Sequence, residues 1–154
     1  MFIPNHLHIL VKGYMNIPPK KEEVLNAFFK SLVERVRMKV VAGPTSVYVS
    51  EEGNEGITGT VTLATSHGSI HVWDKESPAM FQFDLYSCSD FQSEEILNEL
   101  NNWFDIHNTY WVMIDRNKNE FFELGKGLFR PINTEGVGGE KSFEEKIIDS
   151  LKEI

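Results

Sequence analysis

The run Thr-Gly-Thr-Val-Thr-Leu-Ala-Thr-Ser-His-Gly-Ser-Ile-His-Val-Trp, Thr58 to Trp73, and the run Met-Phe-Gln-Phe-Asp-Leu-Tyr, Met80 to Tyr86, decide the fold of this chain. Both runs are rich in β-branched and aromatic residues, and the second alternates between apolar and polar side chains, as half-buried strands do. A short polar link separates them. They therefore predict neighbouring strands that carry the hydroxyl of Ser66 and the imidazole of His71, with the thiol of Cys88 just beyond.

The flanking segments predict further strands and helices. The apolar run Leu7 to Val11 is typical of a strand, with His6 and His8 on one face. Apolar residues then recur at helical spacing, which predicts a helix of about 17 residues after Pro18-Pro19 and a second helix with Ser93 as its N-cap. Further strands are expected at residues 39–41 and 45–49, separated by a Gly43-Pro44 turn, and at residues 110–114 and 120–124; residues 125–139 are expected to be irregular, and a capping box at Ser142–Glu145 predicts a last helix.

The order of these elements predicts an α+β fold with two layers, in which helices pack on one face of a mostly antiparallel sheet. A length of 154 residues with 41% hydrophobic residues is typical of a single domain with a substantial core, so we expect residues 1–154 to form one domain. The other face of the sheet must also be covered. Self-association is the simplest way to cover it.

Charge and cysteine content exclude several classes of partner. The net charge is -8, and lysine and arginine are scattered among acidic residues without a basic stripe. Nucleic acids and anionic membrane surfaces are therefore not expected as partners, because binding them requires clustered cations. The chain shows no signal peptide and no apolar run as long as a membrane span, and its single cysteine cannot form an internal disulfide. These features predict a cytoplasmic protein.

The combined motif spacing resembles the bacterial and archaeal S-adenosylmethionine decarboxylase proenzymes. That family has Ser-Gly before a strand, then Glu-Ser-His, a Ser/Thr-Ile-His-Thr-Trp run, and an Asp followed four residues later by Cys. The matching residues here are Thr58-Gly59, Thr65-Ser66-His67, Ser69 to Trp73, and Asp84 with Cys88. The resemblance covers about residues 6–125 and leaves residues 126–154 as a C-terminal extension with a helix. It implies the family's fold, a homodimer, S-adenosylmethionine as substrate and a role in spermidine synthesis.

The resemblance also implies that the chain cuts itself between Thr65 and Ser66. The Ser66 Oγ would attack the carbonyl carbon of Thr65, so that an ester replaces the peptide bond. A base would then remove the α-proton of residue 66, and β-elimination would break the chain. Hydrolysis of the resulting dehydroalanine leaves a pyruvoyl group, a ketone that serves as an electron sink during decarboxylation, as pyridoxal phosphate does in other enzymes.

Position by position, the resemblance assigns roles to the other residues of the site. His71 corresponds to the processing base, Thr58 to the hydroxyl that stabilises the tetrahedral intermediate, and Cys88 to the acid that protonates the product. Trp73 and either Asp74 or Glu76 fall where the family binds substrate, in a loop that is two residues longer here.

Two departures from the family pattern matter for the chemistry. Thr65 replaces the glutamate that precedes the reactive serine, which adds β-branching and removes a charge; this predicts slow cleavage without forbidding it, because the attacked carbonyl belongs to the main chain. Lys12 stands where the family has a glutamate near the end of the first strand. A cation there opposes binding of a sulfonium substrate by Coulomb repulsion.

Other interpretations of the same residues stay open. The chain is alternatively an unprocessed, catalytically silent homologue with a binding or regulatory role, or a decarboxylase of another amino acid. Taken singly, Ser66 and His67 are typical turn residues, His71 is typical of a half-exposed strand, and Cys88 of a packed position. A metal site is a further alternative, with ligands of suitable type at His6, His8, His67, His71 and Cys88, but without compact metal-binding spacing, so no metal is expected.

Overall fold

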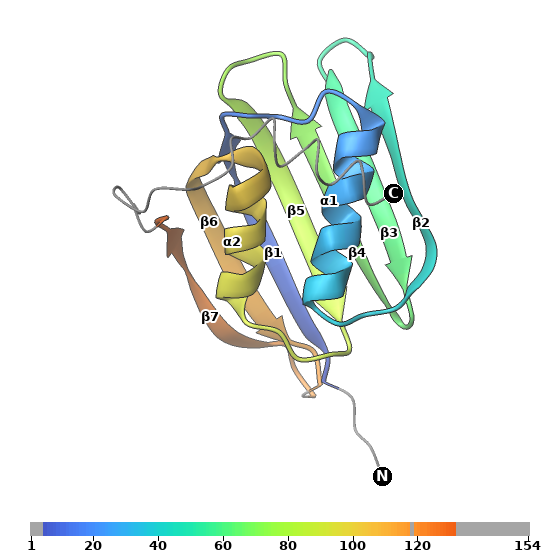
Figure 1. Ribbon diagram of the computed structural model, residues 1–154. Coiled ribbons are helices and arrows are strands. Elements are labelled where there is room, and N and C mark those ends of the chain that lie inside the picture. The colour runs from blue at the N-terminus through green and yellow to red at the C-terminus, as the bar shows by residue number, and fades with distance from the viewer. Residues whose placement is uncertain (1–4, 118, 132–154) are drawn as a thin grey trace, which may run out of the picture.

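The structure, a computed structural model, describes residues 5–117 and 119–131, which form two helices and seven strands (Figure 1). In chain order these are β1 (Leu7–Met15), α1 (Glu22–Arg35), β2 (Val40–Val49), β3 (Gly56–Leu63), β4 (Ser66–Trp73), β5 (Ala79–Ser87), α2 (Ser93–Phe104), β6 (Ile106–Asp115) and β7 (Phe122–Phe129). In the described part of the chain, neither helix has the length and apolar character needed to cross a membrane.

All seven strands belong to one antiparallel sheet with the order β2-β3-β4-β5-β1-β6-β7. The first strand of the chain lies near the middle of the sheet, between β5 and β6. Its register pairs His8 with Tyr86 of β5 and with Ile114 of β6. Strands β4, β5 and β1 therefore lie side by side, although β1 is far from the other two in the sequence.

Both helices lie on the same face of the sheet, and the core fills the space between the two layers (Figure 1). Aromatic residues from both layers are fully buried there, among them Phe28 and Phe29 of α1 and Phe81 of β5. Burial of each such ring contributes about 2–3 kcal/mol. This arrangement confirms the predicted two-layer α+β fold, because the alternate side chains of Met80 to Tyr86 divide between the core and the opposite face as expected.

The face without helices, called the open face below, is formed by the alternate side chains that include His8 in β1, His67 in β4, Asp84 in β5 and Tyr110 in β6. Several of its apolar side chains are exposed to solvent in the single chain: Leu10, Tyr14, Met80 and Tyr110. An uncovered sheet face with this composition is typical of an interaction surface.

The helix boundaries differ slightly from the predicted ones. Helix α1 has 14 residues, where about 17 were predicted, and the acidic side chains of Glu22 and Glu23 lie in its first turn. The prediction of Ser93 as N-cap was wrong by one residue. Gln92 precedes the helix, and its N–H donates to Glu95 Oε2 at 2.8 Å, so the carboxylate satisfies an otherwise free helix-end donor.

Two predictions that glycine residues interrupt or end a strand were wrong. Gly43-Pro44 does not separate two strands but lies inside β2, where the pairing with β3 shifts register and Gly43 adopts a φ of 82°. Likewise, β7 continues through Gly125 and Gly127, which were expected to begin an irregular region. These two glycines pack against the indole of Trp111, so their lack of a side chain makes room for that ring instead of ending the strand. The helix predicted after Ser142 lies outside the described residues.

Candidate active site

The β3–β4 turn brings together three of the residues predicted to form the reactive centre, Thr65, Ser66 and Cys88. Leu63 pairs with Ser66, so Ala64 and Thr65 form a two-residue turn, and Thr65 has a left-handed φ of 60°. Ser66 is buried, and its Oγ accepts a hydrogen bond from the Cys88 N–H at 3.0 Å. Strand β5 ends beside the turn, which explains why Cys88 lies next to the predicted scissile bond.

The environment of Cys88 favours its thiolate. Thr65 Oγ1 lies 3.0 Å from Cys88 Sγ and 2.7 Å from the Ala64 carbonyl oxygen. The hydrogen bond from Thr65, with a smaller contribution from Ser66, lowers the pKa of the Cys88 thiol below its ordinary value, against the opposing effect of burial. A thiol with a lowered pKa releases its proton more readily, which suits a general acid.

Thr58 and His71 form a separate pair farther along the sheet. They are register partners on β3 and β4, and Thr58 Oγ1 lies 3.1 Å from His71 Nδ1. The two side chains lie on the open face, whereas Ser66 points toward the helix layer. His71 lies five positions after Ser66 on β4. At about 3.3 Å per residue, this places the two residues roughly 16 Å apart. Within one chain, the structure therefore does not bring this pair to the Ser66 hydroxyl.

The residues expected to bind substrate also lie away from Ser66. Asp74 follows β4, and its carboxylate contacts Lys20 Nζ at 2.9 Å and the Tyr48 hydroxyl at 2.8 Å. Burial raises the pKa of Asp74, but the hydrogen bonds from Lys20 and Tyr48 outweigh it, so the pKa is lowered overall. Glu76 is exposed in the loop after β4, and Trp73 packs its ring 6.1 Å from that of His71.

A cavity of about 810 Å³ opens on the open face, across β1, β4, β5, β6 and β7. Its lining includes His71, so the Thr58–His71 pair borders the cavity, whereas Trp73, Asp74 and Glu76 are not part of the lining. Two lysines, Lys12 and Lys126, line it as well.

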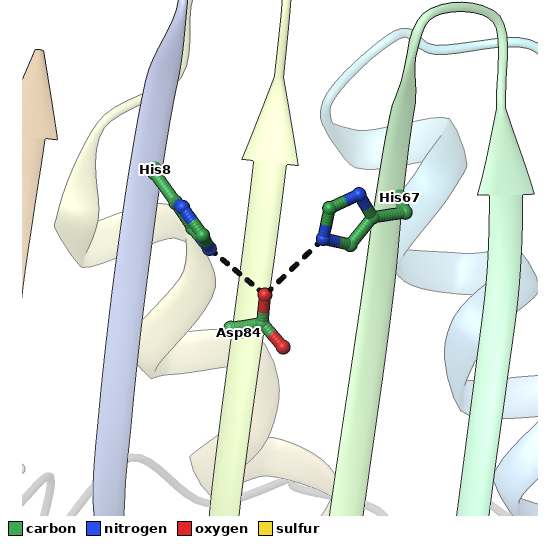
Figure 2. Close-up of side chains that lie close together, drawn as sticks. All are labelled: His8, His67 and Asp84. Carbon is green, nitrogen blue, oxygen red and sulfur yellow. Dashed lines mark hydrogen bonds and ion pairs between the residues drawn. The ribbon is translucent and has the colours of Figure 1, made fainter. Parts of the chain in front are cut away.

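Sequence reasoning assigned no role to Asp84, which the structure places at the centre of a polar cluster. The carboxylate lies between His8 of β1 and His67 of β4 (Figure 2), with Oδ2 at 2.8 Å and 3.4 Å from their Nε2 atoms. Its other oxygen accepts a hydrogen bond from Ser69. Burial raises the pKa of Asp84, but the hydrogen bonds from His8 and Ser69 lower it below its ordinary value overall. Only the polar position of Asp84 within an alternating strand hinted at such a role.

The structure thus combines a two-layer fold with Ser66 and His67 directly after a tight turn and Cys88 next to Ser66. Sequence comparison shows which family of proteins shares these features. Residues 7–117 match the family model described as S-adenosylmethionine decarboxylase. The chain therefore belongs to the S-adenosylmethionine decarboxylase family. It is also similar to a protein of Archaeoglobus fulgidus described as an S-adenosylmethionine decarboxylase proenzyme, with 28% identity over 95 residues that cover 62% of this chain and 80% of that protein.

Proposed function

We propose that this chain is a pyruvoyl-dependent decarboxylase that makes its prosthetic group from Ser66, acts on S-adenosylmethionine and supplies spermidine synthesis. The cluster at the β3–β4 turn carries the proposal: the Ser66 hydroxyl, the adjoining Thr65 peptide and the Cys88 thiol meet there in a chain of this family. A pyruvoyl group at residue 66 supplies a sink for the electrons that departing CO2 leaves behind.

The local conformation supports Ser66 as the precursor of that group. Thr65 is β-branched and yet left-handed, which costs about 1–3 kcal/mol. Cleavage of the Thr65–Ser66 bond frees Thr65 from this conformation, so the cost favours the cut chain. In the cut chain, Cys88 is well placed to donate a proton beside residue 66.

The position of the Thr58–His71 pair supports a homodimer as the working unit. The pair lies too far from Ser66 of its own chain to act there, and it borders a cavity on an uncovered face. We therefore extend the proposal to two copies that meet through their open faces, so that the pair from one copy acts on the Thr65–Ser66 peptide of the other, which is exposed at Thr65: Thr58 stabilises the oxyanion that forms at the Thr65 carbonyl, and His71 removes the α-proton of residue 66.

Co-expression of two defective chains tests this arrangement. Ser66→Ala lacks the attacking oxygen, and His71→Ala lacks the base, so neither chain alone should yield cut product. When both are expressed together with different tags, the intact Ser66 of the second chain meets the intact His71 of the first. We expect intact-mass spectrometry to show cleavage of the His71→Ala chain only in this mixture.

A matched control replaces the Ser66→Ala chain by the double variant Ser66→Ala/His71→Ala, which should restore nothing. Failure of the Ser66→Ala chain to rescue its partner, with wild-type chain cut under the same conditions, would contradict the shared site. Wild-type chain that stays at full length would favour the unprocessed, silent homologue instead.

The cavity favours one alternative substrate class. Lys12 and Lys126 both line it and repel a sulfonium cation, whereas they would attract a substrate with an additional carboxylate. The second candidate is therefore a pyruvoyl decarboxylase of an acidic amino acid. Release of labelled CO2 by cut protein from carboxyl-labelled S-adenosylmethionine supports the first candidate. Release from labelled glutamate or aspartate alone supports the second.

A further inference from the structure

Three side chains from adjacent strands converge on one point of the open face, apart from the Ser66 cluster. His8, Asp84 and His67 come from β1, β5 and β4, and Figure 2 shows both imidazole rings turned toward the carboxylate between them. The three donor atoms lie within 4.8 Å of one another. The sheet itself sets this arrangement, because Tyr86 pairs directly with both His8 and His67, and Asp84 lies two residues before Tyr86 on the same strand.

The distances suit a shared cation. Ligand atoms that bind a zinc-sized ion at about 2.0–2.2 Å lie roughly 3.0–3.5 Å from one another. Asp84 Oδ2 is 2.8 Å from His8 Nε2 and 3.4 Å from His67 Nε2. Without a cation, only His8 Nε2 is hydrogen-bonded to this oxygen, and His67 Nε2 faces it at ion-pair distance. With a cation, both rings present the lone pair of a neutral imidazole, which is the form that binds metals.

The surroundings have the features of a supported metal site. Ser69 donates a hydrogen bond to Asp84 Oδ1 and so holds the carboxylate in place, as partners of metal ligands commonly do. The side chains of His8 and Asp84 are largely buried, with 19% and 25% exposure, while His67 is 50% exposed and leaves one side open. The ring of Tyr86 lies 5.8 Å from each imidazole ring and forms a wall.

We propose that His8, His67 and Asp84 bind a divalent transition-metal ion such as Zn²⁺ or Co²⁺. Two imidazoles and one carboxylate are the ligand types that these ions prefer, and three protein ligands leave a position for water or a small ligand. The ion would tie three strands together one residue away from Ser66. Asp84 and Ser69 also line the cavity described above, but binding of the ion does not require the chain to be cut.

Titration of the chelator-treated full chain with Co²⁺ tests the site without any activity measurement. We expect one ion per chain with micromolar or tighter affinity, a visible spectrum typical of nitrogen and oxygen ligands, and a higher unfolding temperature with Zn²⁺, because an ion that binds only the folded chain stabilises it. Asp84→Asn and His8→Gln should each weaken binding at least tenfold. Ser69→Ala keeps all three ligands and should weaken it about tenfold.

The control is His107→Gln, which removes an imidazole that stacks on Tyr14 outside the cluster and should leave binding unchanged. Absence of a stoichiometric ion in the wild-type chain would overturn the proposal and leave the cluster as an ion pair. An intense sulfur-to-cobalt charge-transfer band would do so too, because it would place the ion at Cys88. Equal affinity in folded Asp84→Asn, checked by circular dichroism, would exclude this ligand set.

Discussion

Thr65 controls two properties of the turn, the main-chain conformation and the state of the neighbouring thiol. It departs from the family pattern immediately before Ser66, and it has a left-handed φ of 60° and a contact with Cys88 Sγ. Substitutions of Thr65 can therefore test separately the effect of side-chain shape on the main chain and the effect of its hydroxyl on the Cys88 thiol.

The first prediction concerns the Cys88 thiol. Thr65→Val keeps the shape but removes the hydrogen bond that favours the thiolate, so the pKa of Cys88 should rise and alkylation by iodoacetamide should begin at higher pH than in the wild type. The wild-type midpoint should lie below the value of about 8.5 of an ordinary cysteine. Thr62→Val, at an exposed position of β3, is the control; equal pH profiles for all three proteins would show that Thr65 does not act on the thiol.

The second prediction concerns the rate of chain cleavage. Thr65→Glu restores the charge found in the family and removes the β-branch next to the carbonyl that Ser66 attacks, so cleavage at Ser66 should become faster. Thr65→Gln isolates the role of shape, because it has the same length without the charge. Time-resolved intact-mass spectrometry measures both rates. Unchanged cleavage in both variants would show that residue 65 does not limit processing.

At the scale of the elements, a buried polar network joins the two helices. Glu99 of α2 is almost fully buried, and it accepts hydrogen bonds from Ser31 and from Trp103 Nε1 and pairs with Arg35 Nε at 2.7 Å. Ser31 and Arg35 belong to α1, so this carboxylate fixes how the helices lie against each other. The helical periodicity of α2 does not predict this network, because the sequence does not show which residues of the other helix contact a glutamate on an apolar stripe.

The third prediction follows from this network. Glu99→Ala leaves the part-buried donors of Ser31 and Trp103, and the guanidinium of Arg35, without their acceptor and should lower the free energy of unfolding by about 2–3 kcal/mol. Urea denaturation monitored by tryptophan fluorescence measures the change. Asn98→Ala, an exposed neighbour on the same helix, should change it by less than about 0.5 kcal/mol. Similar values for the two variants would mean that the network does not stabilise the helix pair.

The sequence predicts individual elements here better than it predicts which elements are neighbours. Alternation within Met80 to Tyr86 identifies β5, and helical spacing identifies α1 and α2, because these signals are local. The cluster at Asp84 depends on the insertion of β1 between β5 and β6, which no local pattern encodes. The distance between His71 and Ser66 likewise follows from the extended conformation of β4. The two residues are close in the sequence motif, so the motif alone gives no sign that they lie apart in space.

At the scale of the whole molecule, the predicted cut falls between strands that remain paired. Residues 1–65 carry β1 and β3, and residues 66–154 carry β4, β5 and β6. After the cut, β3 still pairs with β4, and β1 still lies between β5 and β6. The two fragments should therefore form one folded unit.

The fourth prediction tests that unit directly. Residues 1–65 and 66–154, expressed together as separate chains with a tag on one, should co-purify and elute as one species under native conditions. They should separate in concentrated urea. The control is a first fragment that lacks β1, residues 16–65, which should bind much more weakly because two strand pairings are lost. Separate elution of the complete fragments would show that the covalent turn is needed for the fold.

The place of β1 also determines when the molecule can assemble during its synthesis. This strand is made before the other strands of the described sheet, but both of its neighbours are made more than sixty residues later, from Ala79 to Asp115. Until then, β2, β3 and β4 can pair with one another and pack against α1, but β1 has no neighbouring strand to pair with. Non-local pairing of this kind slows folding. The proposed scission at Ser66, which needs β4 and β5 in place, is therefore expected only in chains that have been made past residue 115.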